Sequence, residues 1–284
     1  MPSKSVMSHP TDILFSALAT PLANQGITTD NVGNGGKTVA ALSNGVALRI
    51  MPLGASITYG QASTDGNGYR SSLRDAIAKL GNQVNMVGSR QHGSMKDNEV
   101  EGWPGYKIHE VHAKARTAVP AYKPNVVLIN AGTNDATGNV NLSTAGDKMG
   151  AMIDEVFAAS PRAVVILSTL IINTVPATEA RVAIINDQFR GLAKRMRDAG
   201  KRVILVDMHD ASKGPIPSDM FDTTHPTDVG YRKMANIWYQ GIVEASSLKW
   251  IQAPEPVGSV PDSGVAMATE VKKKVGKRVE VFEA

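Results

Sequence analysis

A serine, a histidine and an aspartate occur in this sequence at positions from which loops can bring them together. Ser56 follows the apolar run 48–53 after two small residues, and Asp222 stands three residues before His225 near the end of the chain. A serine hydroxyl becomes an effective nucleophile only when a base accepts its proton during the attack, and a carboxylate can hold the imidazole that acts as this base. These residues therefore predict attack on an ester carbonyl, with Ser56 as nucleophile, His225 as general base and Asp222 as its partner.

Such an attack also needs hydrogen-bond donors for the negative charge that develops on the carbonyl oxygen. The candidates are the backbone N–H groups of Ser56 and Gly105 and the side-chain amide of Asn134, which follows another apolar run. Gly105 precedes a predicted helix, where N–H groups are free, and it has no side chain to obstruct an ester. Gly88 is the competing choice for the second donor.

Three aromatic residues flank the expected site and are candidates for substrate binding. Tyr59, Trp103 and Tyr106 have rings that can stack on a sugar, although packing within the protein is an equally good interpretation. The remaining histidines give no set of ligands with metal-binding spacing, and the sequence Asp-Gly-Asn-Gly at 65–68 is too short for a calcium loop. We therefore expect no metal and no cofactor.

Each proposed catalytic residue also has an ordinary structural interpretation. A serine after a strand is commonly a turn or capping residue, Asn134 followed by an aspartate is commonly a turn, and Asp222 near a helix start is commonly a cap. His225 taken alone is a surface histidine. The catalytic interpretation is favoured because all of these residues follow predicted strands, whose carboxyl ends meet at one edge of a parallel sheet.

From residue 46 onward, apolar runs alternate with helical periodicity, which is typical of repeated βα units around a parallel sheet. The apolar runs predict five strands, at residues 48–53, 84–88, 126–130, 164–167 and 203–206. The helical spacing of apolar residues predicts helices at about 73–80, 108–119, 149–157 and 182–196, and a last helix that starts at Pro226. A long polar loop is expected through residues 96–99.

These elements predict a single three-layer α/β/α sandwich of the flavodoxin-like kind. Residues 1–45 are expected to form an N-terminal extension, 46–250 the hydrolase domain, and 251–284 a linker followed by a mixed-charge tail. A chain of 284 residues with 42% hydrophobic content can bury a sizeable core.

Composition excludes several other classes of function. The net charge is only +4 and the basic residues are scattered except at 272–278, so no nucleic-acid partner is expected. The absence of cysteine excludes disulfides, thiolate metal sites and a cysteine nucleophile. No stretch approaches the roughly 18–20 apolar residues of a membrane span. The apolar run 13–19 is a weak candidate for a signal peptide, so a secreted and a cytoplasmic location both stay open, as does the oligomeric state.

Four segments of the chain resemble, in order, the four sequence blocks of the SGNH (GDSL-like) hydrolases. They are Gly54-Ala55-Ser56, the glycine of Glu101-Gly102-Trp103-Pro104-Gly105, Gly132-Thr133-Asn134-Asp135 and Asp222-Thr223-Thr224-His225. Their surroundings are most similar to carbohydrate esterase family three, the acetyl-xylan-esterase branch, through Met51-Pro52-Leu53-Gly54, Gly68-Tyr69-Arg70, Val87-Gly88-Ser89 and His225-Pro226. The resemblance covers residues 46–247. It departs from the family pattern at Ala55, where the family usually has Asp.

The resemblance implies a five-stranded parallel sheet in the order 2-1-3-4-5 and a Ser-His-Asp triad that works through an acyl-enzyme. It also implies removal of short acyl groups, mainly acetyl, from a small molecule or a polysaccharide such as acetylated xylan. Two alternatives remain, a broader lipase-like esterase or thioesterase and a non-catalytic carbohydrate-binding member of the fold. A nucleotide-binding protein is disfavoured because the loop after the first strand lacks a glycine-rich phosphate cradle.

Overall fold

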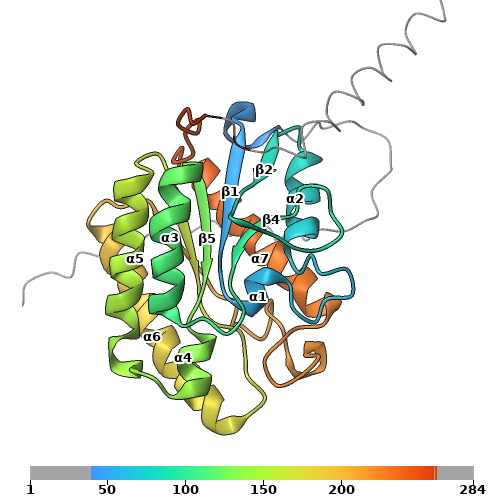
Figure 1. The fold of residues 1–284 in the computed structure, drawn as a ribbon, viewed down its shortest axis with the longest axis vertical. Helices are drawn as coiled ribbons and strands as arrows, with labels where there is room; N and C mark the ends of the chain where they lie inside the picture. The colour runs from blue at the N-terminus through green and yellow to red at the C-terminus, as the bar shows by residue number, and fades with distance from the viewer. Residues whose placement is uncertain (1–39, 259, 261–284) are drawn as a thin grey trace, which may run out of the picture. The chain divides into compact units, whose positions relative to one another are not determined.

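A central sheet of seven strands organises the part of the chain that the computed structural model describes, residues 40–258 and 260 (Figure 1). The strands are β1 Leu48–Gly54, β2 Val84–Met86, β3 Arg90–Gln91, β4 Glu99–Gly102, β5 Val126–Asn130, β6 Val164–Ser168 and β7 Val203–Val206. They lie in the order β3-β4-β1-β5-β6-β7, and β2 also pairs with β1. All pairs are parallel except β3 with β4.

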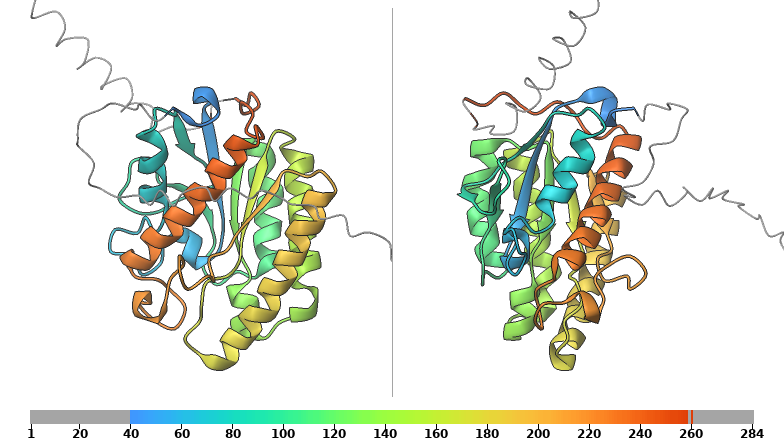
Figure 2. Two further views of the ribbon diagram at one scale, coloured as in Figure 1. Left: turned by 180° about the vertical axis from the view of Figure 1, so that it is seen from behind. Right: turned by 90° about the vertical axis from the view of Figure 1, so that its right-hand side faces the viewer.

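Helices cover both faces of this sheet (Figure 2). The α-helices are α1 Ser56–Tyr59, α2 Arg70–Ala78, α3 Ile108–Tyr122, α4 Thr133–Gly138, α5 Ala145–Ala159, α6 Pro176–Asp198 and α7 Asp228–Ser247, and the 3-10 turns are η1 Leu42–Gly45, η2 Leu142–Thr144 and η3 Pro217–Asp219. The apolar sides of α3, α5 and α6 pack on one face, and those of α2 and α7 pack on the other. None of the helices in the described part of the chain is long and apolar enough to cross a membrane.

Alternate residues of each central strand enter opposite cores. In β5, Val126 and Leu128 pack on the side of α2 and α7, while Val127 and Ile129 pack on the side of α3, α5 and α6. All four side chains are fully buried. This explains why the strand is apolar throughout rather than alternating, because helices exclude water from both of its faces.

The five strands predicted from the sequence are all present, and β2-β1-β5-β6-β7 reproduces the expected order 2-1-3-4-5. The expected strand number is wrong, because part of the polar segment between β2 and α3 forms β3 and β4. The charged residues of β4 interrupt the apolar pattern that would predict a strand. In the structure, the carboxylate of Glu101 accepts hydrogen bonds from the N–H and hydroxyl of Ser89 and from Trp103 Nε1, at 2.7 to 3.0 Å. These bonds allow a glutamate that is 1% exposed to lie in a strand.

Pro52 marks the point at which β1 changes its neighbour on one side. Before Pro52, the carbonyl of Ile50 accepts a hydrogen bond from the N–H of Val87, which follows β2. After Pro52, the carbonyl of Gly54 accepts a hydrogen bond from the N–H of Trp103, which follows β4. Groups two residues apart point to the same side of a strand, so the missing N–H of Pro52 falls between these two bonds. A proline is therefore tolerated in a central strand because β2 ends there and β4 begins.

Three expectations about helices need correction. The short helices α1 and α4 were not predicted, and α7 begins at Asp228 rather than Pro226. Thr227 is the N-cap of α7, with its hydroxyl accepting from the N–H of Gly230. Pro226 instead forms an antiparallel bridge with Met220, which places it in the preceding loop. Of the predicted extension 1–45 and tail 251–284, residues 1–39, 259 and 261–284 lie outside the described residues.

Candidate active site

Ser56 begins the single turn of α1 at the carboxyl end of β1. Gly54, the last residue of β1, makes this turn possible, because a Cβ there would lie 2.1 Å from the carbonyl oxygen of Asn130 and 2.3 Å from Thr58 Oγ1. Ser56 itself is 7% exposed. As the first residue of a helix, it has a backbone N–H without a helical acceptor. One residue thus presents both a hydroxyl and a free N–H at the edge of the sheet where ligands bind.

The hydroxyl of Ser56 meets a histidine and an aspartate from the far end of the chain. His225 Nε2 lies 2.9 Å from Ser56 Oγ, although the two residues are 169 positions apart. On the other side of the ring, His225 Nδ1 lies 2.8 Å from Asp222 Oδ2. The remaining carboxylate oxygen of Asp222 accepts from the N–H groups of Thr224 and His225, each at 2.7 Å. The structure therefore brings together the three residues that the sequence singled out.

Hydrogen bonds hold the carboxyl group of Asp222 in its charged form. Partial burial by itself would raise the pKa of Asp222, but hydrogen bonds from the ring and N–H of His225 and from the N–H of Thr224 outweigh it and keep this pKa below its usual value. A charged carboxylate at Nδ1 favours the tautomer whose Nε2 can accept a proton from Ser56. The arrangement is therefore suited to activating a hydroxyl for attack.

The loop 207–227 carries Asp222 and His225 back from β7 to β1, past the two strands β6 and β5 that lie between them. Within it, the N–H of Phe221 donates to the carbonyl of His225 at 2.8 Å, which closes a tight hairpin around the acid and the imidazole. After the loop, the carboxylate of Asp228 accepts from the N–H and hydroxyl of Thr64, at 2.9 and 2.7 Å. The start of α7 is thereby tied to the segment that follows the serine turn.

Asn134 lies on α4, after β5, and fixes the loop that contains Gly105. Its Nδ2 donates to the carbonyl of Tyr106 at 2.9 Å. The neighbouring Asp135, only 1% exposed, accepts from the N–H of Ile108 at 2.9 Å and so caps α3. Burial raises the pKa of Asp135, and the bond from Ile108 opposes this effect. This role of Asp135 could not be predicted from the sequence, since no local pattern reveals that a carboxylate on one helix caps another.

The two glycines considered as backbone donors occupy different environments. Gly105 is exposed, has a φ of +83° and would carry a Cβ that meets no atom within 4 Å. It is thus open toward solvent, beside the residue that Asn134 holds. Gly88 is buried, and a Cβ there would lie 2.1 Å from the carbonyl carbon of Val100 in β4. The lack of a side chain at Gly88 is thus needed for strand packing.

The aromatic residues beside the site form a stack with basic side chains. The ring of Tyr59 lies 3.8 Å from the ring of His92, nearly parallel to it, and 4.4 Å from the guanidinium carbon of Arg90. Arg90 also lies 4.8 Å from the ring of Trp103, which has Lys114 Nζ at 4.0 Å. These groups pack against the rings of Tyr59 and Trp103, and both residues remain partly exposed. Both rings therefore take part in packing within the protein. Stacking of a sugar on their exposed parts stays a prediction.

Two further aromatic rings lie near the site. Tyr106 stacks on Trp103 with ring centroids 5.5 Å apart and remains half-buried. Phe221, next to Asp222, is 69% exposed and is the most exposed of the large apolar residues that the structure describes. Phe221 could not be identified from the sequence, because exposure of a single phenylalanine in a loop leaves no sequence pattern.

Arg70 is a buried cation that joins the segments around α1. Its guanidinium donates to four carbonyl oxygens, at 2.8 to 3.1 Å, on Tyr59, Gly66, His92 and Asn98. Burial lowers the pKa of Arg70, and nearby tyrosines and Asp65 act in the opposite direction. The bonds connect the end of α1 to the loops before α2 and before β4.

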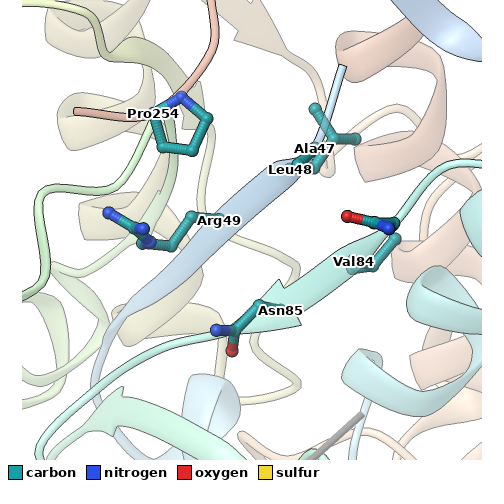
Figure 3. Close-up of a pocket in the computed structure, with 7 residues that line it drawn as sticks. Ala47, Leu48, Arg49, Val84, Asn85 and Pro254 are labelled. Carbon is teal, nitrogen blue, oxygen red and sulfur yellow. The ribbon is translucent and has the colours of Figure 1, made fainter. Parts of the chain in front are cut away.

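The described residues offer no metal site beside Ser56, and the cavity in Figure 3 lies elsewhere. Among residues 40–258 and 260, no group of three or more His, Asp or Glu side chains is placed to hold a metal ion. His112, one of the paired histidines in the sequence, instead contacts Glu155 at 2.5 Å. The cavity, of about 80 Å³, lies at the amino ends of β1 and β2, the opposite end of β1 from Ser56. It is lined by Ala47, Leu48, Arg49, Gln83, Val84, Asn85 and Pro254.

Comparison with known proteins gives a family match over most of the described residues. The sequence model of the GDSL-like lipase/acylhydrolase family matches residues 53–233. A multidomain esterase of Ruminococcus flavefaciens is 27% identical over 231 residues, which are 69% of this chain and 28% of that protein. A curated protein of Acetivibrio thermocellus is 26% identical over 139 residues, which are 48% of this chain and 58% of that protein. The chain thus spans only part of the length of these relatives.

Solved structures with the same fold include two carbohydrate esterases of family 3. The one from Clostridium thermocellum is 25% identical with a TM-score of 0.64, covering 71% of this chain and 98% of that chain. The one from Talaromyces cellulolyticus is 23% identical with a TM-score of 0.62, covering 70% of this chain and 98% of that chain. The predicted three-layer fold is thereby confirmed.

Proposed function

We propose that this chain, which belongs to the GDSL-like lipase/acylhydrolase family, is a serine esterase. It would remove short acyl groups, mainly acetyl, from carbohydrate. One observation carries the proposal. Ser56 Oγ lies 2.9 Å from His225 Nε2, and Asp222 lies 2.8 Å behind the same ring. Local backbone structure does not account for this contact, because the serine and the histidine come from opposite ends of the domain.

The first half of the reaction transfers the acyl group to the protein. Ser56 Oγ attacks the ester carbonyl carbon while its proton passes to His225 Nε2. As the tetrahedral intermediate collapses, the bond from carbon to the alkoxy oxygen breaks, and His225 returns the proton to the departing alcohol. Asp222 stabilises the imidazolium that exists between these two transfers. The products of this half are a free alcohol and an acyl ester on Ser56.

The second half releases the acyl group as a carboxylic acid. Water enters where the alcohol left, and His225 removes its proton as the water oxygen attacks the acyl carbon. The bond from that carbon to Ser56 Oγ then breaks, and the serine recovers its proton from His225. The cycle needs no metal and no cofactor, since every proton moves between water, substrate and these side chains.

Three donors are proposed for the negative oxygen of both tetrahedral intermediates. The backbone N–H of Ser56, the backbone N–H of Gly105 and the Asn134 side-chain amide are available from three different segments. One hydrogen of the Asn134 amide goes to the carbonyl of Tyr106, which leaves the other for the substrate. Loss of one such donor typically costs about 3–4 kcal/mol of transition-state stabilisation.

The proposed substrate class is supported by similarity rather than by the triad, which any acyl ester can use. The Clostridium thermocellum protein of the same fold, 25% identical to this chain, is a family 3 carbohydrate esterase. Carbohydrate recognition also agrees with the exposed ring of Phe221 beside Asp222, because aromatic rings stack on sugars.

The proposal is tested by measuring acetate release from acetylated xylan, from other acetylated polysaccharides and from 4-nitrophenyl esters. We expect release from acetylated xylan and a steep fall in rate from the acetate to the octanoate ester. Ser56→Ala should lose at least about 10³-fold in rate. Ser247→Ala, which changes an exposed serine at the end of α7 whose hydroxyl donates to the carbonyl of Glu244 in the same helix, should keep the wild-type rate.

Other outcomes would favour the alternatives. A rate that is maintained up to octanoate would indicate a broader lipase-like esterase. A wild-type protein that is inert on every ester but binds xylo-oligosaccharides would indicate a non-catalytic carbohydrate-binding protein, and the proposed function would be wrong.

A further inference from the structure

The loop 207–227 must hold its catalytic side chains in place although it spans the sheet edge far from its own strand. A small error matters here, since misplacing a catalytic group by about 1 Å can cost about 10²-fold in rate. One neighbouring segment contacts this loop both near its beginning and near its end. It consists of residues 170–179, which connect β6 to the first turn of α6.

The contact near the end of the loop acts on the residues around the triad acid. Asn173 Nδ2 donates to Thr224 Oγ1 at 3.1 Å, and the N–H of Thr174 donates to the carbonyl of Thr223 at 3.1 Å. The N–H of Thr224 in turn donates to Asp222 Oδ1 at 2.7 Å. The Asn173 carboxamide is therefore connected to Asp222 through one residue, Thr224, which hydrogen-bonds to both.

Asn173 is itself fixed from several directions. Its side chain is buried, at 6% exposure for the residue, and its Oδ1 accepts from the N–H of Val175 at 3.0 Å. Its own N–H donates to Glu179 Oε2 at 2.7 Å, and Glu179 Oε1 lies 2.9 Å from His209 Nε2. His209 belongs to the beginning of the same loop. The segment therefore holds the loop at His209 and at Thr224, with Asn173 and Glu179 between these two points.

We propose that Asn173 is a positioning residue of this esterase, which fixes Asp222 against His225 through Thr224. Glu179 and His209 support it by holding the backbone of Asn173 and the start of the loop. Asn173 acts on the reaction only through the triad, so its effect on rate rests on the proposed function. Its effect on the geometry of Asp222 and His225 is independent of the proposed function.

The test combines kinetics with a signal from the triad itself. The variants are Asn173→Ala, Thr224→Val, which removes the hydroxyl at nearly constant volume, and Thr224→Ser, which retains it. Gln188→Ala is the matched control, because Gln188 also tethers α6 through its amide, at Leu142 and Gly146 away from the loop. The triad signal is the proton NMR resonance of His225 Nδ1–H bonded to Asp222, assigned by its loss in His225→Ala.

We expect Asn173→Ala and Thr224→Val to broaden or abolish that resonance by faster exchange with water. Both should lower kcat on 4-nitrophenyl acetate about 10- to 100-fold with little change in KM, because the substrate site is retained while the acid is displaced. The double variant should be no worse than the poorer single one, since both remove the same bond. Thr224→Ser should restore the resonance and most of kcat, and Gln188→Ala should leave both unchanged.

The inference is overturned if the resonance stays sharp and kcat stays at the wild-type value in Asn173→Ala, or if Gln188→Ala has the same effect. If Asn173→Ala does not fold, equal behaviour of Thr224→Val and Thr224→Ser would overturn it instead. These failures differ from failure of the proposed function, in which the wild-type protein is inert on all esters. Even then the resonance decides whether Asn173 positions Asp222.

Discussion

Ala55 is the residue at which this chain departs from the SGNH pattern, and its position gives the departure a physical consequence. It is the N-cap of α1, with φ −109° and ψ −140°, and it has no side chain to accept a hydrogen bond from the first turn. The turn it precedes carries Ser56. The carboxylate of an aspartate at an N-cap accepts such a bond. Its negative charge also interacts favourably with the positive end of the helix dipole. Ala55 therefore leaves the start of the serine turn without a side-chain hydrogen bond.

We expect Ala55→Asp to stabilise the protein by about 0.5–2 kcal/mol, the usual range for a gained N-cap. The free energy of unfolding in urea is the measurement. Ala55→Asn should gain a similar amount, since it supplies an acceptor without a charge. Ala55→Val adds bulk at the same position without an acceptor and should gain nothing. Equal changes in all three variants, or destabilisation by Asp and Asn alone, would contradict the capping argument.

Asp97, between β3 and β4, shows how a polar segment is built into the sheet. Its carboxylate accepts from the N–H of Met86 in β2 at 3.0 Å and from the guanidinium of Arg74 in α2. The side chain is 1% exposed. Burial raises the pKa of Asp97 to about 6, although the bonds from Arg74 and Met86 oppose this. The folded state therefore binds this proton more tightly than the unfolded chain does.

This difference predicts that Asp97 contributes most to stability below about pH 4, and that the contribution is lost as the pH rises toward 6 and beyond. The difference between the usual aspartate pKa of 3.8 and the raised pKa of about 6 corresponds to roughly 3 kcal/mol in the free energy of unfolding. The variant Asp97→Asn carries an amide that cannot titrate, so wild-type stability relative to this variant should fall by about this amount between pH 4 and pH 7. Urea unfolding of both proteins at several pH values measures it. A difference independent of pH, or one that grows with pH, would contradict the prediction.

The same elements show which parts of the fold the sequence could reveal. Strands such as β5, buried on both faces, leave continuous apolar runs, so all five were found. The strands β3 and β4 leave no such run, because Glu99 and Glu101 occupy β4. Their burial depends on partners such as Ser89 that are distant in sequence or unremarkable in type. The start of α7 was misplaced by two residues, because Pro226 suits a first helical turn as well as the bridge it forms with Met220.

The parallel sheet explains why some of the site residues meet. The turns that carry Ser56 and Asn134 follow neighbouring strands, β1 and β5, so their side of the site follows from strand order alone. The return of His225 from β7 does not follow from strand order. It depends on tethers such as Asp228 to Thr64 and Asn173 to Thr224, which connect segments that show no pattern in the sequence. Ser56, Asn134, Asp222 and His225 could therefore be identified from the sequence as candidates, while the residues that hold the loop could not.

The proposed mechanism depends on activation of Ser56 by a histidine 169 positions away in the sequence. Labelling with a fluorophosphonate, followed by mass spectrometry of the peptides, tests it without assuming any natural substrate. We predict a single modified residue, Ser56, and a labelling rate at least about 10³-fold lower in His225→Ala. Modification at another residue, or equal labelling of Ser56 in His225→Ala, would contradict activation of Ser56 by His225.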